Sequence, residues 1–561
     1  MRTPRPARRM LFSAKTFCAF LLAILLLMGS LASAAAAPAA PESGASVFIG
    51  GGECPFAEPV LCDGSVYYLP LRNALANLGV PDGGIVWNGG DESVQFVFDQ
   101  KSYKLSIGSD KVEIDGAVSD LGAAAFLYSG NSRTYIPAKF VAEALYNDPA
   151  WSIAGKDGKL LAGVSLLAAN SWAPSTKAAL DRMIIANGVS SPGYDPEAKP
   201  YAVFDFDNTT SIFDVEEALL IYQLENLRFK IAPDKMFDVL TTEVPKDDFS
   251  ESYANSEGKA LNIDIVANDC QKDYAWLCEN YKGLGYGGKM SLDEVKKAPQ
   301  YKDFIVKVRF LYDAIGDAFD AAVSYPWVTY LFTGMTSKEV YDLAVESHDY
   351  WIAYAKFEKI KWVSPEDFET ESGSVSVSYK TGINFMAEMQ DLYAKLQKNG
   401  IEVYVCSASF IDVIEAAAYE PKFGLNVKKG NVYAMMLKKD EDGRYINAYD
   451  YDNYFQTQGP GKKKTIDKFI VPKHGGKGPV FVAGDSQGDY NMITEYDDMA
   501  LGLIVNRIRK DDFKIISQMA ADTIGQPDAK YVLQGRDENK GIFIPSESSI
   551  LLGADEAKLL P

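Results

Sequence analysis

From residue 201 onward, runs of apolar residues alternate with segments of helical periodicity. The apolar runs indicate strands and have the sequences YAVFDFD, EVYVCSAS, PVFVAGDS and MALGLIVN. Stretches such as EMQDLYAKLQKNG and KKKTIDKFI repeat apolar residues every three or four positions, as amphipathic helices do. Near-continuous apolar strands separated by helices are typical of a sheet that is buried on both faces. We therefore predict an α/β fold with a Rossmann-like core, in which helices cover both faces of a parallel sheet.

One long segment interrupts this alternation. Residues 212 to about 395 are mainly helical in pattern and rich in aromatic residues, so they indicate a cap inserted into the core. A helical stretch, STKAALDRMIIANG, and a turn-rich stretch, SSPGYDPEAKP, precede the first core strand. We assign residues 168–561 to one domain that carries this cap.

Residues 45–167 contain an internal repeat. VYYLPLRNALANLG is echoed by RTYIPAKFVAEALY, and in each copy an aromatic residue and a proline precede an amphipathic helix. Alternating strands such as SVQFVFD and a turn at Asp115-Gly116 lie between the copies. This pattern predicts a small α+β domain with two repeats. It contains no group of polar or titratable residues that suggests a reaction, which favours a spacer or a surface-binding module in contact with the cell envelope.

The first residues have the pattern of a secretory signal peptide. Arginines lead, an apolar run follows from Phe17 to Met28, and small residues close it, so we expect residues 1–37 to be a cleaved leader. An uncleaved anchor helix is the alternative. The protein is then expected to be secreted or extracytoplasmic, and it could remain at the cell surface.

The composition of the chain limits which ligands and which catalytic groups are possible. The net charge of −20 at pH 7 offers no basic footprint for a nucleic acid. The chain has only two histidines, His348 and His474, so carboxylates must carry any catalysis. Two cysteine pairs, each separated by seven residues, predict local disulfides in an oxidising compartment, and Cys406 within an apolar run predicts a buried, inert thiol; the pairs are Cys54 with Cys62 and Cys270 with Cys278.

Four polar patches follow or end predicted core elements. In chain order they are DFDNT from Asp205, CSAS around Ser407, GKKKTI around Lys462, and GDSQGD from Asp485. Ligands bind at the carboxyl ends of parallel strands, where such patches would meet. In this order and with these residue types, the chain resembles the haloacid dehalogenase superfamily of phosphohydrolases over roughly residues 170–561.

The resemblance implies a role for each patch. Asp205 would attack phosphorus and form an aspartyl-phosphate, and Asp207 would protonate the leaving oxygen and then activate water. Mg²⁺ would be held by Asp205, by the main-chain carbonyl of Asp207 and by Asp485, with Asp489 supporting these ligands. The reaction implied is hydrolysis of a small phosphomonoester.

The remaining positions would bind the phosphoryl group. Lys462 would contact a phosphate oxygen, although the run of lysines at residues 462–464 leaves its two neighbours as alternatives. Ser407, the main chain at Ala408, and Thr209 would complete the cradle.

The insertion resembles a C1-type cap, and residues 45–167 resemble the N-terminal module of copper amine oxidases. NTTSIFDVEEALL, YPWVTYLFTGMT and GINFMAEMQDL are similar to bacterial phosphorylcholine phosphatases and their phosphoserine phosphatase-like relatives. One of Glu216 and Glu217 would then hold a cation on the substrate, although favourable pairing with the helix dipole explains them equally well. Candidate aromatic partners of that cation are Tyr222, Tyr274, Trp276, Tyr281, Tyr325 and Trp327.

The substrate stays open at this point. Phosphocholine, phosphoserine, phosphoethanolamine and a broad range of phosphomonoesters are the alternatives within the phosphatase hypothesis. A cell-surface binding protein whose hydrolase fold is idle is the alternative from another class, and the intact set of four motifs favours the enzyme.

Overall fold

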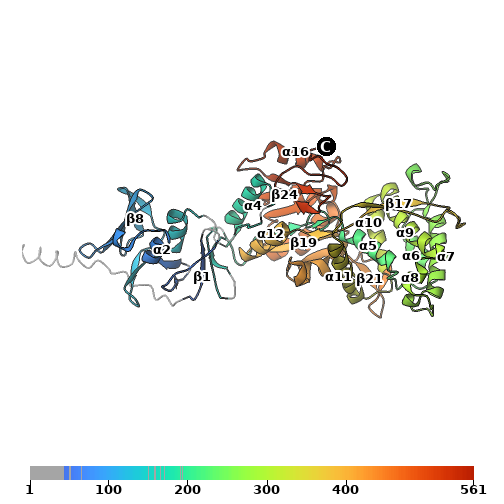
Figure 1. Ribbon diagram of the computed structural model, residues 1–561, viewed down its shortest axis with the longest axis horizontal. Helices are drawn as coiled ribbons and strands as arrows, with labels where there is room; N and C mark the ends of the chain where they lie inside the picture. The colour runs from blue at the N-terminus through green and yellow to red at the C-terminus, as the bar shows by residue number, and fades with distance from the viewer. Residues whose placement is uncertain are drawn as a thin grey trace, which may run out of the picture. The chain divides into compact units, whose positions relative to one another are not determined.

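The computed structural model describes residues 43–49, 52–64, 66–148, 151–156, 160–164, 166–169, 171–189, 191 and 194–561. The chain divides into two compact units, Met1–Val164 and Ser165–Pro561 (Figure 1). The predicted leader, residues 1–37, lies outside the described residues. Within the part of the chain that is described, no helix has both the length and the apolar character needed to span a bilayer.

The two sequence repeats form the centre of the first unit. Strand β4 (Val66–Pro70) leads into helix α2 (Leu71–Asn77), and strand β11 (Arg133–Pro137) leads into helix α3 (Ala138–Phe140). The two strands pair antiparallel about the equivalent residues Leu69 and Ile136, in a sheet of order β10-β11-β4-β3. The flanking strands are β3 (Leu61–Asp63) and β10 (Phe126–Tyr128).

Two further sheets complete this unit. One is an antiparallel meander whose last two strands join at the predicted turn, where Asp115 and Gly116 have φ angles of 51° and 84°. Such left-handed pairs form the tight turns that match strand twist. Its strands are β5 (Ile85–Asn88), β6 (Ser93–Phe98), β7 (Lys101–Ser106), β8 (Lys111–Ile114) and β9 (Ala117–Asp120). The other sheet contains β1 (Ser46–Ile49), β2 (Gly52–Cys54), β12 (Ser152–Ala154) and β13 (Leu160–Gly163).

The second unit is built on a six-stranded sheet of order β20-β19-β14-β23-β24-β25, in which all neighbours are parallel. Strand β14 lies inside the sheet, and Val203 is in register with both Tyr404 and Val482. The parallel sheet predicted from the apolar runs is therefore present. The strands are β14 (Tyr201–Phe204), β19 (Glu402–Phe410), β20 (Val432–Met435), β23 (Phe481–Gly484), β24 (Leu501–Val505) and β25 (Tyr531–Gln534).

Helices cover both faces of this sheet. Alternate strand residues such as Val203 and Val482 share one apolar core with α14 (Pro460–Phe469), α15 (Tyr490–Thr494) and α16 (Lys514–Asp522). On the opposite face, the ring of Phe204 lies 4.2 Å from that of Tyr393 on α12 (Ala387–Lys398). Helix α4 (Pro174–Asn187) also contacts the sheet, at β24 and β25. Strands buried on both sides need the near-continuous apolar runs that the sequence contains.

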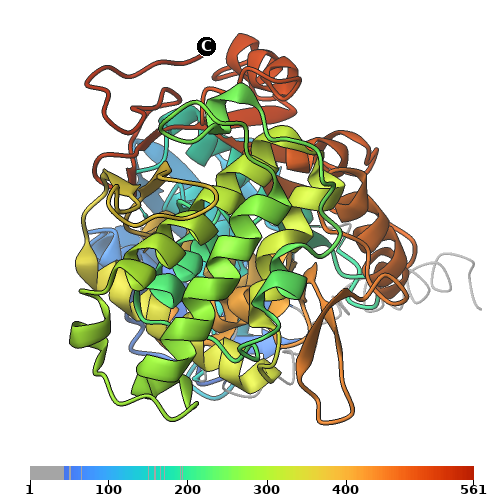
Figure 2. The same ribbon diagram turned by 90° about the vertical axis from the view of Figure 1, so that its right-hand side faces the viewer.

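The predicted cap is inserted after β14, and its helices lie in front of the sheet in Figure 2. It begins and ends at a short antiparallel pair, β15 (Ser211–Ile212) with β18 (Asn384–Phe385). It therefore ends before the predicted boundary near residue 395, because α12 packs on β19 of the core. The cap contains α5 (Val215–Glu225), α6 (Met236–Leu240), α7 (Ile263–Asn280), α8 (Leu292–Val295), α9 (Pro299–Ala318), α10 (Ala321–Thr329), α11 (Ser337–Tyr354) and the strand pair β16 (Lys359–Val363) with β17 (Ser376–Lys380).

A second, smaller insertion was not predicted. After β20, strands β21 (Leu437–Lys439) and β22 (Tyr445–Tyr449) form a hairpin. The backbone of Tyr445 donates to the carbonyl of Met335 and accepts from the N–H of Gly334, both at 2.8 Å, and both partners belong to the cap. The Tyr445 hydroxyl also donates to Asp412 of the core at 2.7 Å. This hairpin therefore joins the cap to the core at a second place.

The two predicted disulfides are wrong, because both pairs of cysteines carry free thiols. Cys270 and Cys278 lie eight residues apart on the single helix α7, and at about 1.5 Å per residue their Cα atoms are separated by about 12 Å. A disulfide needs Cα atoms within about 7 Å. Cys54 and Cys62 belong to strands of different sheets.

We predict that protein prepared without reductant, unfolded in guanidinium chloride and then alkylated, carries an alkyl group on both Cys270 and Cys278. In the folded protein both thiols should react slowly, because both side chains are buried. Mass spectrometry of the peptide that contains α7 measures this. A peptide two hydrogen masses lighter than the alkylation-free dithiol form would contradict the structure.

Candidate active site

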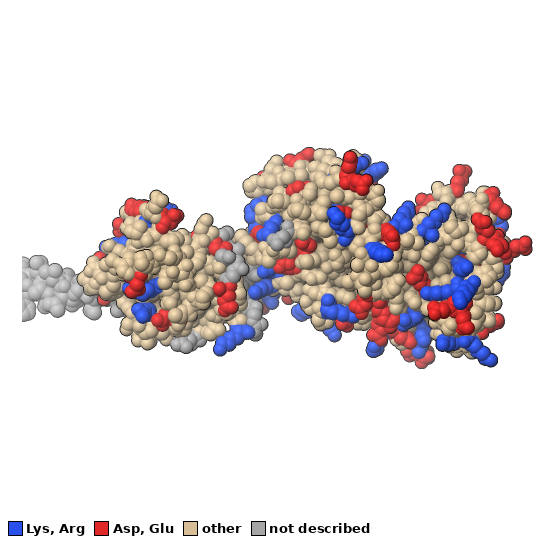
Figure 3. All heavy atoms as spheres, in the orientation of Figure 1, with Lys and Arg blue, Asp and Glu red and all other residues tan. Residues whose placement is uncertain are grey.

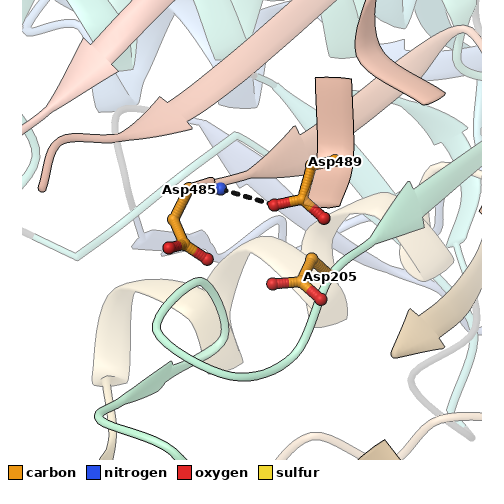
Figure 4. Close-up of side chains that lie close together, drawn as sticks. All are labelled: Asp205, Asp485 and Asp489. Atoms are coloured by element: carbon orange, nitrogen blue, oxygen red, sulfur yellow. Dashed lines mark hydrogen bonds between the residues drawn. The ribbon is translucent and has the colours of Figure 1, made fainter. Parts of the chain in front are cut away.

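Two buried aspartates follow directly after neighbouring strands of the core sheet. Asp205 follows β14 and Asp485 follows β23, and Asp489 lies one turn beyond Asp485. One carboxylate oxygen of each lies within 4.8 Å of the others, and Figure 4 shows the three carboxylates directed toward one another. Segments separated by almost three hundred residues thus meet at the carboxyl edge of the sheet, as the strand-end argument predicted.

Lys462 links two of these carboxylates. Its ammonium group donates to Asp205 Oδ1 and, at 2.6 Å, to Asp489 Oδ1, and all three side chains are buried. Lys462 lies in the first turn of α14, which begins at Pro460. Its neighbour Lys463 instead forms a pair with Asp467 at 2.7 Å one helical turn away. Among the lysines of residues 462–464, the structure therefore brings Lys462 to the site.

The second carboxylate oxygen of Asp489 is occupied by the main chain. Oδ2 accepts the N–H groups of Asp485 at 2.9 Å and of Ser486 at 3.1 Å, and the first of these bonds is drawn in Figure 4. The loop can close this tightly because residue 484 is glycine: a Cβ there would lie 2.6 Å from the Cβ of Asp489. The main role of Asp489 is therefore to fix the direction of Asp485, and its own side chain does not line the cavity.

Burial and charge set the proton affinities of this group. Burial raises the pKa of Asp205 well above its usual value, and the charge of Asp489 adds to this while Lys462 opposes it. Burial also raises the pKa of Asp489, with Lys462 opposing. For Asp485, burial acts in the same direction, but the guanidinium of Arg507 outweighs it and holds the pKa below the usual range. The pKa of Lys462 is raised, because the two carboxylates outweigh its burial.

Arg507 is the residue that the sequence analysis missed at this edge. It follows strand β24, and one of its guanidinium nitrogens donates to Asp485 Oδ2 at 2.6 Å. The sequence contained a signal for Arg507, because RIR comes directly after the apolar run MALGLIVN and so at the end of a predicted core strand.

Thr209 has a role different from the predicted one. Its hydroxyl lies 3.0 Å from Asp205 Oδ2 and 3.0 Å from Asp485 Oδ1, and the side chain is fully buried. It therefore holds the two carboxylates in place and does not line the cavity. The loop that carries it turns sharply: three successive N–H groups, of residues 209–211, point to the carbonyl of Phe206, and Asn208 has a φ of 64°.

Asp207 points away from Asp205 toward the start of the cap. Its Oδ1 accepts the N–H of Val215 at 2.7 Å, and its Oδ2 accepts the hydroxyl of Ser409 at 2.6 Å. Ser407, which was predicted to bind the phosphoryl group, is 3.4 Å from the same oxygen and is itself fully buried. Burial raises the pKa of Asp207 well above its usual value, and the charge of Asp214 adds to this. Ser409 was not predicted.

The aspartates open onto a cavity of about 480 Å³ between the core and the cap. Core residues Ala408 and Ser409 line it, while Ser407 lies behind them. The cap contributes three tyrosine side chains and two aspartates, which are Tyr253, Tyr312, Tyr325, Asp313 and Asp317.

Of the six aromatic residues predicted as cation partners, only Tyr325 lines this cavity. Tyr274 and Trp327 are buried within the cap, where the first donates to the carbonyl of Ile231 and the second to that of Leu240. Tyr222, Trp276 and Tyr281 do not line the cavity either. Tyr253 and Tyr312 were missed, because their positions depend on how the short turn Glu251–Tyr253 and helix α9 pack within the cap.

The adjacent glutamates at the start of α5 separate into two roles. Glu216 lines the cavity, and its Oε1 accepts the N–H of Phe410 at 3.1 Å. Burial, with the charge of Asp214 adding to it, raises the pKa of Glu216 to about 8. Glu217 turns away and pairs with Arg309 of α9 at 2.5 Å. The N-cap of this helix is Asp214, whose carboxylate accepts the N–H groups of both glutamates.

The residues present fit a hard divalent cation. Asp205, Asp485 and Asp489 offer oxygen ligands close enough to share one ion, and oxygen-only sets of this kind suit Mg²⁺. Asp489 is the weakest candidate for a direct ligand, because its oxygens already accept four hydrogen bonds.

The histidines and Cys406 lie outside this chemistry. His348 is buried in contact with the carbonyl of Val413, and burial lowers its pKa to about 4. His474 contacts the hydroxyl of Tyr404 and the carbonyl of Lys199. Burial raises the pKa of Cys406 to about 12, in agreement with the predicted inert thiol.

Comparison with known proteins agrees with this architecture. The copper amine oxidase N-terminal domain family matches residues 48–157. A phosphorylcholine phosphatase from Pseudomonas aeruginosa is 26% identical over 254 residues, which are 44% of this chain and 52% of that protein. The chain thus spans about half the length of this curated relative.

Among solved structures, a conserved protein of unknown function from Anaerococcus prevotii matches with a TM-score of 0.63 and 33% identity, over 68% of this chain and 98% of that one. A phosphoserine phosphohydrolase-like protein from Francisella tularensis matches with 13% identity and a TM-score of 0.24, over 55% of this chain and 87% of that one. The chain therefore belongs to one family with the Anaerococcus prevotii protein, it is similar to a phosphorylcholine phosphatase, and its residues 48–157 match the copper amine oxidase N-terminal domain family.

Proposed function

We propose that the protein is a Mg²⁺-dependent phosphomonoesterase that forms an aspartyl-phosphate on Asp205. The observation that carries this proposal is the convergence of Asp205, Lys462 and Asp485 at one edge of the sheet, next to a cavity of about 480 Å³. A cavity of this size suits a small ester.

Asp205 is the nucleophile in this proposal. The ammonium of Lys462 on its Oδ1 lowers the pKa of this carboxylate against the larger effect of burial, and it later neutralises charge on the phosphoryl oxygens. Bound Mg²⁺ would supply charge neutralisation between nucleophile and phosphate, held by Asp205, the carbonyl of Asp207 and Asp485. The oxygens of the phosphoryl group would also face the main chain at Ala408, which lines the cavity.

Asp207 is the general acid and base. A raised pKa suits this role, because the group must hold a proton at neutral pH and release it to the leaving oxygen. Its carboxylate is bonded to Ser409 and to the N–H of Val215, so it must rotate from these partners to reach the substrate. The proton returns when Asp207 deprotonates the water that hydrolyses the aspartyl-phosphate.

The cap side of the cavity favours a substrate with an ammonium group, such as phosphocholine. Asp317 supplies negative charge, Glu216 does so above its pKa of about 8, and Tyr312 and Tyr325 supply aromatic faces. Quaternary ammonium ions are recognised by this combination. The relative named above is a phosphorylcholine phosphatase, which supports the same substrate class.

We further propose that the reaction takes place outside the cytoplasm, where the leader pattern would direct the chain. The N-terminal unit would then act as a spacer or bind the cell envelope.

The central test is hydrolysis of p-nitrophenyl phosphate with Mg²⁺. We expect turnover that EDTA abolishes and added Mg²⁺ restores, and a loss of at least about 10³-fold in kcat for Asp205→Asn. Equal colour release by this variant and the wild type would contradict the proposal and favour a non-catalytic binding protein.

Lys462→Met should lower kcat by about 10²-fold or more, because the phosphoryl charge loses its buried cation. Lys463→Met is the matched control, since Lys463 pairs with Asp467 and does not line the cavity. Its kcat should stay within about twofold of the wild type. A larger loss for Lys463→Met than for Lys462→Met would show that the lysine assignment is wrong.

The preference for a cationic ester should depend on pH through Glu216. Its pKa of about 8 means that the carboxylate is protonated below that pH and charged above it, so attraction to an ammonium group strengthens as pH rises. We expect kcat/KM for phosphocholine, divided by that for glycerol phosphate, to increase between pH 7 and pH 9. In Glu216→Gln the ratio should be lower and independent of pH. A flat ratio in the wild type would remove Glu216 from cation binding.

A further inference from the structure

A second cavity lies behind the active site. It has a volume of about 600 Å³ and is bounded by residues 357–359 of the cap, by Lys380 of β17, and by the segments around Arg507 and Glu538 of the core. Leu551, Leu552 and Gly553 close it. None of the sequence motifs pointed to this cavity.

The cavity is basic within an acidic protein. Four cationic side chains line it and only two acidic ones do, whereas the whole chain has a net charge of −20. The cations are Lys359, Lys380, Arg507 and Arg509, and the acids are Glu358 and Glu538. In Figure 3, Lys and Arg side chains gather in the area where Figure 1 labels β17.

Three of the four cations have an acidic partner: Arg507 donates to Asp485 at 2.6 Å, Arg509 forms an ion pair with Asp511, and Lys380 lies near Glu538. Glu538 pairs with the buried Arg536 and lies 3.5 Å from Lys380. Glu358 accepts a hydrogen bond from Tyr354 at 2.9 Å. Among the described residues, no acidic side chain forms an ion pair with Lys359, which is exposed on β16.

Arg507 lines both cavities, and the two have opposite charge. Seven carboxylates and two cations line the active-site cavity, in contrast to the basic cavity. The carboxylates are those of Asp205, Asp207, Asp214, Glu216, Asp313, Asp317 and Asp485. Carboxylates therefore outnumber cations around a phosphate dianion in the active-site cavity, where Lys462 attracts it, whereas cations outnumber carboxylates past Arg507.

We propose that the basic cavity binds inorganic phosphate, and that phosphate formed in the active site leaves past Arg507 into it. The second half of this inference rests on the proposed phosphatase function. An amino alcohol, the other product, carries positive charge and leaves through the acidic cavity. The two products are thus sorted by charge into separate routes, and Arg507 is the residue common to both cavities.

Binding is tested first, and without catalysis. Isothermal titration calorimetry with inorganic phosphate in the presence of EDTA measures the affinity of the basic cavity for phosphate. Binding at the metal-free active site is disfavoured, because that site presents carboxylates to the anion. We expect Lys359→Glu/Arg509→Glu to weaken this binding by about tenfold or more. Lys359→Glu alone should weaken it by a smaller factor, and it carries little risk to folding because the side chain is exposed.

The matched control is Lys361→Glu/Lys514→Glu, which changes the net charge equally. Both side chains are exposed, and neither lines the cavity. Its phosphate affinity should stay within about twofold of the wild type. Equal affinity in the cavity variant and the control would overturn the proposed site.

Release is tested by stopped-flow, with p-nitrophenyl phosphate as substrate and a fluorescent phosphate sensor. In the cavity variant we expect an unchanged burst of p-nitrophenol followed by phosphate release that is at least about threefold slower than in the wild type. Unchanged phosphate release together with weakened binding would overturn the exit route and leave a site that takes phosphate from the medium. Loss of all turnover in the wild type would refute the phosphatase proposal, while the titration still decides the anion site.

Discussion

The second unit depends on how it accommodates three buried carboxylates at one edge of its central sheet. Asp205, Asp485 and Asp489 come within 4.8 Å of one another, where like charges repel strongly in a poorly solvated site. Lys462 and Arg507 offset this charge, and main-chain N–H groups take the remaining oxygen of Asp489. Three carboxylates this close destabilise the fold without a cation, and for the same reason they bind a cation well. A bound cation would therefore both stabilise the fold and serve the chemistry.

The core sheet could be predicted because each of its strands is recognisable from a short stretch of sequence. Each strand is a continuous apolar run, and parallel topology carries the residue after each run to a common edge, so Asp205 and Asp485 could be brought together without knowing any contact. Lys462 could be distinguished from Lys463 only weakly, because the direction of a side chain in the first turn of α14 depends on how that helix packs.

Other features could not be derived from the sequence, for physical reasons that differ. The spacing of Cys270 and Cys278 suggested a disulfide, but an uninterrupted helix keeps them apart. The cavity-lining tyrosines come from cap helices whose mutual packing has no local signature, so Tyr274 and Tyr312 look alike in the sequence although one is core and the other lines the cavity. Ser409 lies closer to Asp207 than Ser407 does, and which serine of β19 approaches that carboxylate depends on how the end of the strand packs.

The hairpin β21–β22 has a consequence for how the cavity is entered. It binds the cap through backbone hydrogen bonds at Gly334 and Met335, far along the chain from the strand pair β15–β18 where the cap begins and ends. A cap attached at two such seams cannot swing about one hinge without breaking one of them. The entrance of the cavity then keeps a constant width. The size and charge of a molecule therefore decide whether it enters, before any chemistry begins.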